Sequence, residues 1–370
     1  MSLAAVIVRT GIFERAAARA ACVELVWKNG GAAGRGRRVI PVGPITWVAD
    51  GAEGLLAMQS TRAGLVEPKR FELIDVDLAP GPGEVLVEVS ACGICSSEIP
   101  VYTGDRPVDM PAFLGHEGSG VVVAVGPGVE GFAEGERVTG AIWQAFATHA
   151  IGDADMLFKV PDGVDMAHAL GEPLFCVANI ARAAAPRFGD HVAVVGCGQM
   201  GLLTIAALRN QGLGSLIAVD ALPERRQLAL AAGATHVTID DPVSEVMDIS
   251  GRGADVVVEL VGKPGGLRLA TDMLRRGQGR LIMGGYHQLD DTYHLRNFSY
   301  QGLIAHSAHP AYSPDMAADY RRALAALARG VFPMDLVVTH RLPLDGIAEG
   351  FDMLRSHAPG YLKGVVVPGA

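Results

Sequence analysis

Short apolar runs separated by Gly and Pro occupy the chain from Met58 to about Pro161. Within this part, Phe71–Asp77 alternates apolar and polar residues, and a Pro-Gly-Pro-Gly turn follows it. The other runs are Val85–Val89, Gly120–Val125, Arg137–Ala141 and Phe146–Ala150. Because runs of this length bounded by turn residues are typical of strands, the pattern predicts a β-rich, barrel-like unit.

Beyond Pro161, apolar runs of strand length alternate with segments of helix length. Strands are expected at Val192, Leu216, His236, Val256 and Leu281, with helices over Leu174–Pro186, Gln199–Asn210, Pro223–Ala232 and Gly265–Arg276. This alternation requires right-handed βαβ crossovers and a parallel sheet. A further helix is expected over Pro314–Arg329, and the tail that ends in Val365–Val367 is expected to fold back onto the β-rich unit.

The patterns predict an α/β protein of two domains. Residues 58–178 and 309–370 form the β-rich domain, and residues 179–308 form a doubly wound, parallel-sheet domain. Residues 1–57 differ from both, since they hold seven Lys/Arg against four Asp/Glu and a Gly/Arg run at Gly30–Arg38. We expect Met58 to be the functional start, with residues 1–57 poorly ordered or an incorrectly assigned start. An organelle-type or regulatory extension is the alternative.

Composition narrows the class of protein. The 370 residues are 49% hydrophobic and 19% charged, with a formal net charge of -9. These values indicate a packed globular protein and exclude a basic surface for nucleic acid or acidic membranes. The longest uncharged stretch, Val192–Leu208, is interrupted by three glycines and is too short for a membrane span.

Cysteine usage bears on the compartment. Five cysteines in a chain of this length do not form a disulfide framework, so we expect a cytoplasmic protein. Cys92 and Cys95 form a single C-x-x-C. A zinc ribbon would need a second such pair, and a thioredoxin-like redox pair remains a weaker alternative.

A glycine loop follows the strand at Val192. Gly196, Gly198 and Gly201 have the G-x-G-x-x-G spacing, and Gln199 and Met200 open the helix that follows. In this context the loop predicts a pyrophosphate site at a helix N-terminus. Asp220 closes the next strand, where an acid would bind both ribose hydroxyls and repel a 2′-phosphate, so NAD is favoured over NADP. Arg225, on the next helix, weakens this preference a little. The alternative interpretation is a solvated Asp at a strand end.

Four residues carry atoms suited to one open zinc site. Cys95 offers a thiolate, His116 an imidazole, and Glu117 or Glu172 a carboxylate, each beside Gly or Pro. Catalytic zinc prefers three protein ligands and one open position. Taken singly, a cysteine is more often a core residue and a glutamate more often solvated. Their occurrence together with the glycine loop favours a metal site beside a nicotinamide cofactor.

The chain resembles the zinc-dependent medium-chain dehydrogenases, the superfamily of alcohol, polyol and threonine dehydrogenases, from about Met58 onward. The segments that carry the resemblance are Gly81–Val87, Cys92–Cys95, Leu114–Gly118, Gly135–Val138, the glycine loop and Gly350–Leu354. The resemblance implies that the β-rich domain is a GroES-like catalytic domain and that the parallel-sheet domain is a Rossmann coenzyme domain.

The resemblance also implies roles at the metal. Cys95, His116 and Glu172 would line the zinc, with Glu117 a ligand or near neighbour that exchanges with Glu172 as water enters. The Glu-Pro-Leu triplet that starts at Glu172 is similar to the polyol and threonine branch. Ser97 would pass the substrate proton toward the cofactor ribose.

Two further positions take their roles from the same resemblance. Glu98 stands where the family usually has Asp, and it would hold the zinc-binding histidine from its far side. Lys363 would fall near the cofactor phosphates.

Two departures from the family pattern matter. The histidine that ends the proton relay in some members is replaced by Pro100, so the proton would leave through ribose and water. The four-cysteine lobe of the structural zinc is absent from the sequence between Val138 and Lys159. We therefore expect one catalytic zinc per chain.

The expected function is hydride transfer between NAD and a secondary alcohol or polyol. A zinc-free reductase of the quinone or enoyl type and a non-catalytic NAD-binding protein are the alternatives. The expected partner is a small alcohol or carbonyl compound, with no nucleic acid and no membrane. A homodimer or homotetramer, joined near Gly302–Ala305, is implied by the family. Gly285–Gln288 and His306–His309 are candidates to face the substrate, or equally to lie in surface or subunit contacts.

Overall fold

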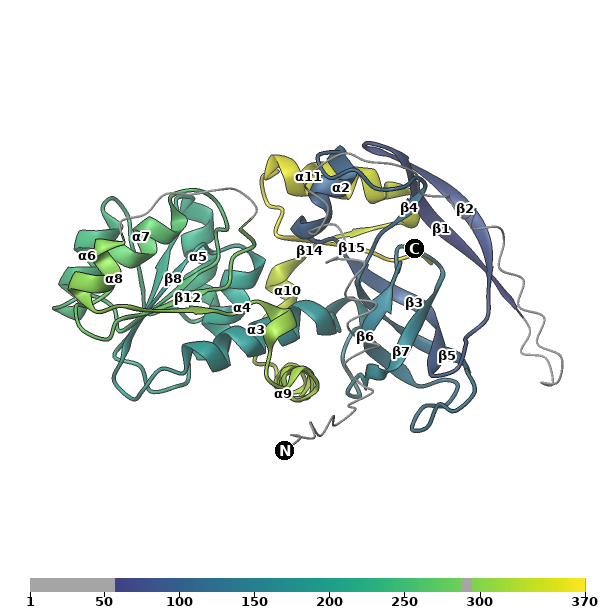
Figure 1. The fold of residues 1–370 in the computed structure, drawn as a ribbon, viewed down its shortest axis with the longest axis horizontal. Coiled ribbons are helices and arrows are strands. Elements are labelled where there is room, and N and C mark those ends of the chain that lie inside the picture. Colours follow the sequence, from purple (N-terminus) through teal and green to yellow (C-terminus); the bar gives the residue numbers. More distant parts are fainter. Residues whose placement is uncertain (1–56, 288–294, 370) are drawn as a thin grey trace, which may run out of the picture. The chain divides into compact units, whose positions relative to one another are not determined.

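A computed structural model of the chain describes residues 57–287 and 295–369, and their strands form three sheets (Figure 1). The expectations for residues 1–57 lie outside the described residues, except at Ala57. A small antiparallel sheet has the order β2-β1-β4. Its strands are β1 (Met58–Glu67), β2 (Arg70–Leu78) and β4 (Ala112–Phe113).

A second sheet forms the barrel-like unit. Its order is β14-β15-β3-β5-β6-β7, and β7 also pairs with β3. The antiparallel strands β3, β5, β6 and β7 therefore close on themselves, which removes their free edges. The strands are β3 (Glu84–Gly93), β5 (Glu117–Val125), β6 (Arg137–Trp143), β7 (His149–Lys159), β14 (Val338–Leu342) and β15 (Lys363–Val366).

Strand β15 joins the barrel from far along the chain. Its Val365 and Val366 pair with Gly93 and Cys92 of β3 in antiparallel register. The prediction that the tail folds back onto the first unit is therefore confirmed. Helices also occur near these strands: α2 (Ile99–Thr103), α10 (Met334–Val337) and α11 (Ile347–Ser356).

The third sheet is parallel and has the order β10-β9-β8-β11-β12-β13. Renumbered within the domain this is 3-2-1-4-5-6, the strand order of a Rossmann fold, so the predicted fold class is confirmed. The strands are β8 (His191–Val195), β9 (Ser215–Val219), β10 (His236–Val237), β11 (Val256–Glu259), β12 (Arg280–Met283) and β13 (Ile304–Ser307).

Helices lie on both faces of this parallel sheet (Figure 1). Val192 and Val194 of β8 pack in one hydrophobic cluster with Leu202 of α4, whereas Ala193 packs in another with Val246 of α6. Alternate residues of a strand point to opposite faces, so both faces are buried and the strand is continuously apolar. The helices are α3 (Gly171–Ala184), α4 (Gln199–Leu208), α5 (Pro223–Ala232), α6 (Pro242–Ser250), α7 (Gly266–Asp272) and α8 (Arg296–Gln301). A further helix, α9 (Met316–Ala328), packs against α3 and the barrel strand β7.

Some predicted elements were wrong in their bounds. A strand was expected over Phe146–Ala150, but β7 begins only at His149. The Phe146 amide instead bonds to the carbonyl of Leu114, which ties this segment to the loop before β5. Helix α6 was not predicted, although Asp241 caps it by accepting a hydrogen bond from the Ser244 amide. Among the described residues, the helices are all too short or too polar to cross a membrane.

Candidate metal centre and nucleotide loop

The ends of two paired strands bring three candidate ligands together. Cys95 follows β3, and Glu117 is the first residue of β5. Because Gly93 pairs with Glu117 across the two strands, the loop with Cys95 meets the loop with His116. One ligand atom of each of Cys95, His116 and Glu117 lies within 4.8 Å of the others. The sulfur, nitrogen and oxygen of this group are a donor set that fits catalytic zinc.

Glu98 fixes the orientation of His116. Its Oε1 lies 3.0 Å from His116 Nδ1 and accepts a hydrogen bond of 2.7 Å from the Gly115 amide. The expected contact is therefore present despite the longer side chain of Glu. Since Nδ1 faces Glu98, Nε2 is the nitrogen left for a metal. Gly115 has a φ of 96°, and a Cβ there would meet the Phe146 nitrogen at 2.7 Å, so only glycine fits this turn.

The charge around His116 suits a cation. Burial disfavours the charged imidazole, but the Glu98 carboxylate and a hydrogen bond with Cys95 outweigh it and raise the pKa of His116 well above its usual value. A site that stabilises positive charge on a proton also stabilises it on a metal ion bound in the proton's place.

Glu117 is paired with a lysine from the far end of the chain. Lys363 Nζ lies 2.7 Å from Glu117 Oε1 and 2.5 Å from Oε2, and it donates a 2.9 Å hydrogen bond to the Ile94 carbonyl. Both side chains are buried. The expectation that Lys363 lies near the cofactor phosphates is wrong, because β15 carries it to the metal centre instead.

Glu172, expected to line the zinc, is not a member of the 4.8 Å group, but it is close enough for its charge to interact with those of His116 and Glu117. It occupies the first turn of α3, and its Oε1 is 3.6 Å from the Sγ of Cys176. Burial raises the pKa of Glu172, and the charge of Glu117 raises it further. The structure therefore brings together three of the four predicted ligands and leaves Glu172 as a partly buried neighbour.

Two more side chains stand at the metal centre. Ser97 donates a hydrogen bond of 3.2 Å to Cys95 Sγ, so the predicted proton carrier is close to a ligand atom. Trp143 ends β6, and its ring centroid lies 6.4 Å from that of His116 with 46% of the residue exposed. Trp143 was missed from the sequence. The available signal was a tryptophan two residues beyond the predicted strand Arg137–Ala141.

The glycine loop lies at the carboxyl end of β8, as a dinucleotide site requires. Gly196 has a φ of 93°, and a Cβ on Gly201 would meet the Gly196 carbonyl oxygen at 1.9 Å. Gly198 stands before Gln199 and Met200, which begin α4. Asp220 Oδ2 accepts a 2.7 Å hydrogen bond from the Cys197 amide, so the predicted acid lies against the loop.

Two side chains near the glycine loop, those of Arg225 and His287, are held in place by hydrogen bonds or ion pairs. Arg225 Nη2 donates a 2.9 Å hydrogen bond to the Tyr361 carbonyl, and Nη1 would lie 3.6 Å from a Cβ on Gly198. His287 Nε2 lies 2.7 Å from Oε2 of the buried Glu259, at the carboxyl end of β11. His287 is therefore held at the same strand ends as the loop, whereas His306 lies on the exposed strand β13.

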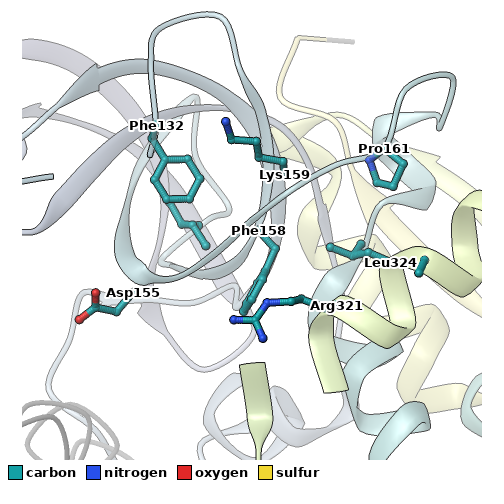
Figure 2. A pocket seen from close by; sticks show the side chains of 9 residues that line it. Phe132, Asp155, Phe158, Lys159, Pro161, Arg321 and Leu324 are labelled. Atoms are coloured by element: carbon teal, nitrogen blue, oxygen red, sulfur yellow. The ribbon is translucent and has the colours of Figure 1, made fainter. Parts of the chain in front are cut away.

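A separate pocket of about 470 Å³ contains none of the predicted site residues (Figure 2). Figure 2 shows Arg321 beside Phe158, with its guanidinium carbon 6.0 Å from the ring centroid. Lys159, which also lines the pocket, is paired with Glu136 at 2.5 Å. The lining residues are Phe132, Asp155, Leu157, Phe158, Lys159, Pro161, Arg321, Leu324 and Ala325.

Comparison with known families agrees with this geometry. The family described as "Alcohol dehydrogenase GroES-like domain" matches residues 81–162, and the family described as "Zinc-binding dehydrogenase" matches residues 200–328. The chain belongs to the medium-chain dehydrogenase/reductase superfamily and is an oxidoreductase of this class.

Individual relatives cover most of the chain. It is 32% identical to (R,R)-butanediol dehydrogenase of Bacillus subtilis over 74% of this chain and 89% of that protein. It is 29% identical to L-threonine 3-dehydrogenase of Pyrococcus horikoshii over 84% of this chain and 98% of that protein. The crystal structure of 2R,3R-butanediol dehydrogenase from Bacillus subtilis matches with a TM-score of 0.74 and 27% identity, over 84% of this chain and 99% of that one.

Proposed function

We propose that the protein is a zinc-dependent dehydrogenase that transfers hydride between a secondary alcohol or polyol and NAD. The carrying observation is the group of Cys95, His116 and Glu117, whose ligand atoms lie within 4.8 Å of one another. Relatives named for butanediol, threonine and sorbitol as substrates support the alcohol and polyol class. A zinc-free reductase would not need this donor set.

Residues of the chain would have separate roles at the metal: binding it, orienting a ligand and moving the substrate proton. Cys95, His116 and Glu117 would hold the ion, and Glu98 would keep His116 Nε2 turned toward it. When bound, zinc supplies Lewis-acid polarisation of the substrate oxygen, and the nicotinamide supplies the hydride acceptor. Ser97 would carry the substrate proton away, since its hydroxyl already contacts Cys95.

The nucleotide half would position the cofactor. The glycine loop and the N-terminus of α4 would bind the pyrophosphate, and Asp220 would bind the ribose hydroxyls. A carboxylate at this point repels a 2′-phosphate, so the proposal favours NAD. Arg225 does not oppose it, because one of its nitrogens is engaged by the Tyr361 carbonyl.

Zinc content and the Cys95→Ser variant test the proposal. Protein purified without chelator should hold about one zinc per chain. The Cys95→Ser protein should lose zinc and turnover of 2,3-butanediol and sorbitol, yet retain NADH binding. Zinc-free wild-type protein that still reduces quinones would support the zinc-free reductase. NADH binding without any turnover would support the non-catalytic alternative.

Two adjacent serines provide a matched pair for the proton step. Ser97→Ala should lower turnover by about 100- to 10,000-fold while leaving zinc content unchanged, which is the range for general acid–base groups. Ser96→Ala changes the exposed neighbour and should leave both quantities as they are. Equal effects of the two substitutions would remove Ser97 from the proposed mechanism.

Assembly is a separate part of the proposal. Strand β13 is the edge of the parallel sheet, and its four residues are exposed. Ile304 of this strand is 43% exposed and the nearby Tyr300 89% exposed. An exposed apolar sheet edge favours pairing with a second copy of the chain. We propose a dimer through β13, to be tested by the mass of the wild-type protein and of Ile304→Lys in solution.

A further inference from the structure

Arg62 is a buried cation on strand β1. The residue is 7% exposed, and its backbone forms a bridge with Ala147. Arginine is rarely buried to this extent unless a carboxylate pairs with it, because moving a charge out of water is costly. The contacts of this guanidinium therefore distinguish a structural role from a role in ligand binding.

The guanidinium has protein contacts but no carboxylate among the described residues. Nη1 donates a 2.6 Å hydrogen bond to Gln144 Oε1, and the central carbon lies 5.7 Å from the Phe113 ring centroid. Nε is buried, and none of the described residues accepts a hydrogen bond from it. Burial lowers the pKa of Arg62, with no acidic neighbour in the described residues to offset it. A structural arginine this deeply buried would normally be paired with a carboxylate, whereas the described partners of Arg62 are neutral, so its uncompensated charge suits an anionic ligand.

Both partners of Arg62 belong to the segments that flank His116. Phe113 lies three residues before His116 in the sequence, and Gln144 directly follows Trp143, whose ring is 6.4 Å from the imidazole. Gln144 has a φ of 57°, a left-handed conformation that is uncommon outside glycine. Unfavourable backbone of this kind concentrates at ligand-binding sites. Arg62 is thus tied to the loops that build the metal centre.

From these contacts we infer that Arg62 recognises an anionic group of the substrate. The substrate class would then be an alcohol that also carries a carboxylate, a hydroxy acid and its keto acid. A guanidinium presents parallel N–H donors that match the two oxygens of a carboxylate, and it remains charged when buried. The inference rests on the proposed alcohol dehydrogenase function and narrows its substrate.

Three matched pairs of compounds test the inference on the zinc-loaded enzyme with NAD. Each pair shares the reacting secondary alcohol and differs in a carboxylate against a hydroxymethyl group. The pairs are lactate and 1,2-propanediol, 3-hydroxybutyrate and 1,3-butanediol, and 4-hydroxypentanoate and 1,4-pentanediol. We expect kcat/KM to favour the acid by about 10- to 100-fold in at least one pair, the range for a hydrogen bond to a charged group. No preference for any acid overturns the inference.

Variants of Arg62 test whether this residue causes the preference for the acid over the diol. Arg62→Met should lower kcat/KM for the preferred acid by about 10- to 100-fold more than kcat/KM for the matching diol. Arg62→Lys keeps the charge without the paired donors and should retain part of the preference. Arg70→Met is the control, since Arg70 is exposed on β2 and pairs with Glu67. Equal loss for acid and diol in folded Arg62→Met would make Arg62 structural and overturn the inference.

A second variant or measurement is needed if Arg62→Met does not fold or if the wild type shows no turnover. If Arg62→Met does not fold, as judged by circular dichroism, Arg62→Lys decides the question, and an unchanged acid-to-diol ratio in it overturns the inference. If the wild type oxidises neither acids nor diols, the proposed function fails. Calorimetric binding of the same pairs to wild type and Arg62→Lys then tests the anion site independently. Binding of the acids that does not exceed that of the diols rejects the site.

Discussion

Lys363 and Glu117 form a buried ion pair at the candidate metal centre, with the ammonium 2.5 Å from one carboxylate oxygen. Each residue is 1% exposed. Glu117 is also one of the three clustered ligands, so its charge is shared between a lysine and any metal ion bound there. The pair therefore joins a buried part of the barrel to the candidate metal centre through one carboxylate.

Removal of Lys363 should destabilise the protein strongly. Lys363→Met leaves the Glu117 carboxylate buried without its cation, and we expect the free energy of unfolding to fall by about 3 to 5 kcal/mol. Urea unfolding of the metal-free protein measures this change. Lys159→Met is the control, because the ion pair of Lys159 with Glu136 lies at the surface and its loss should have little effect. Similar losses in both variants would contradict the prediction.

Replacement of Glu98 should weaken metal binding without unfolding the protein. Glu98→Gln keeps an oxygen for the Gly115 amide but removes the negative charge beside His116 Nδ1. We expect zinc affinity to fall by about 10- to 100-fold, as for other groups that orient a ligand histidine. Competition with a chromophoric chelator measures the dissociation constant. Glu136→Gln, on the surface, should bind zinc like the wild type.

Alanine substitutions at two glycines of the nucleotide loop should change different properties of the protein. A Cβ on Gly201 would meet the Gly196 carbonyl oxygen at 1.9 Å, so Gly201→Ala should lower the unfolding temperature. A Cβ on Gly198 would meet only Arg225 Nη1, at 3.6 Å, so Gly198→Ala should fold normally. It should still lose NADH affinity, since the methyl group would stand where the pyrophosphate approaches the backbone. Thermal melts and NADH fluorescence titration separate the two effects, and normal NADH binding by Gly198→Ala would contradict the assignment of this loop.

Removal of the Asp220 charge should relax the choice of cofactor. Asp220→Asn keeps an oxygen of similar position but ends the repulsion of a 2′-phosphate. We expect the ratio of kcat/KM for NAD to that for NADP to fall by about 10- to 100-fold, the range for hydrogen bonds to a charged group. Steady-state kinetics with both cofactors measures the ratio. Asp240→Asn, at an exposed position, is the control. An unchanged ratio in Asp220→Asn would mean that another residue sets the preference.

Local patterns were sufficient to predict the fold and part of the site. The strand before Gly196 and the helix after it could be expected from periodicity and glycine spacing alone. Cys95, His116 and Glu117 were found because each stands close to a glycine in the sequence and carries a metal-binding atom. The pairing of β3 with β5 brings the loops with Cys95 and His116 together, with Glu117 at the start of β5. The glycine loop depends on residues close in sequence, and the ligand group depends on one pairing, that of β3 with β5.

Other features depend on contacts that no local pattern encodes. Lys363 was expected at the cofactor from the family resemblance. The sequence did predict that the tail returns to the β-rich unit, but not that β15 pairs with β3 and brings Lys363 to Glu117. Arg62 was not singled out, because a charged residue in a strand normally faces solvent. Its burial follows from the packing of Phe113 and Gln144 around it, which are far away in sequence.

The position of β15 also fixes the order in which the metal centre is completed during synthesis. Lys363 is translated 246 residues after Glu117, and the strand that carries it pairs beside Cys92. A nascent chain on the ribosome therefore holds Cys95, His116 and Glu117 long before the cation that neutralises Glu117 exists. During that interval the carboxylate has no lysine to pair with, and the ligand cluster is more anionic than in the finished protein.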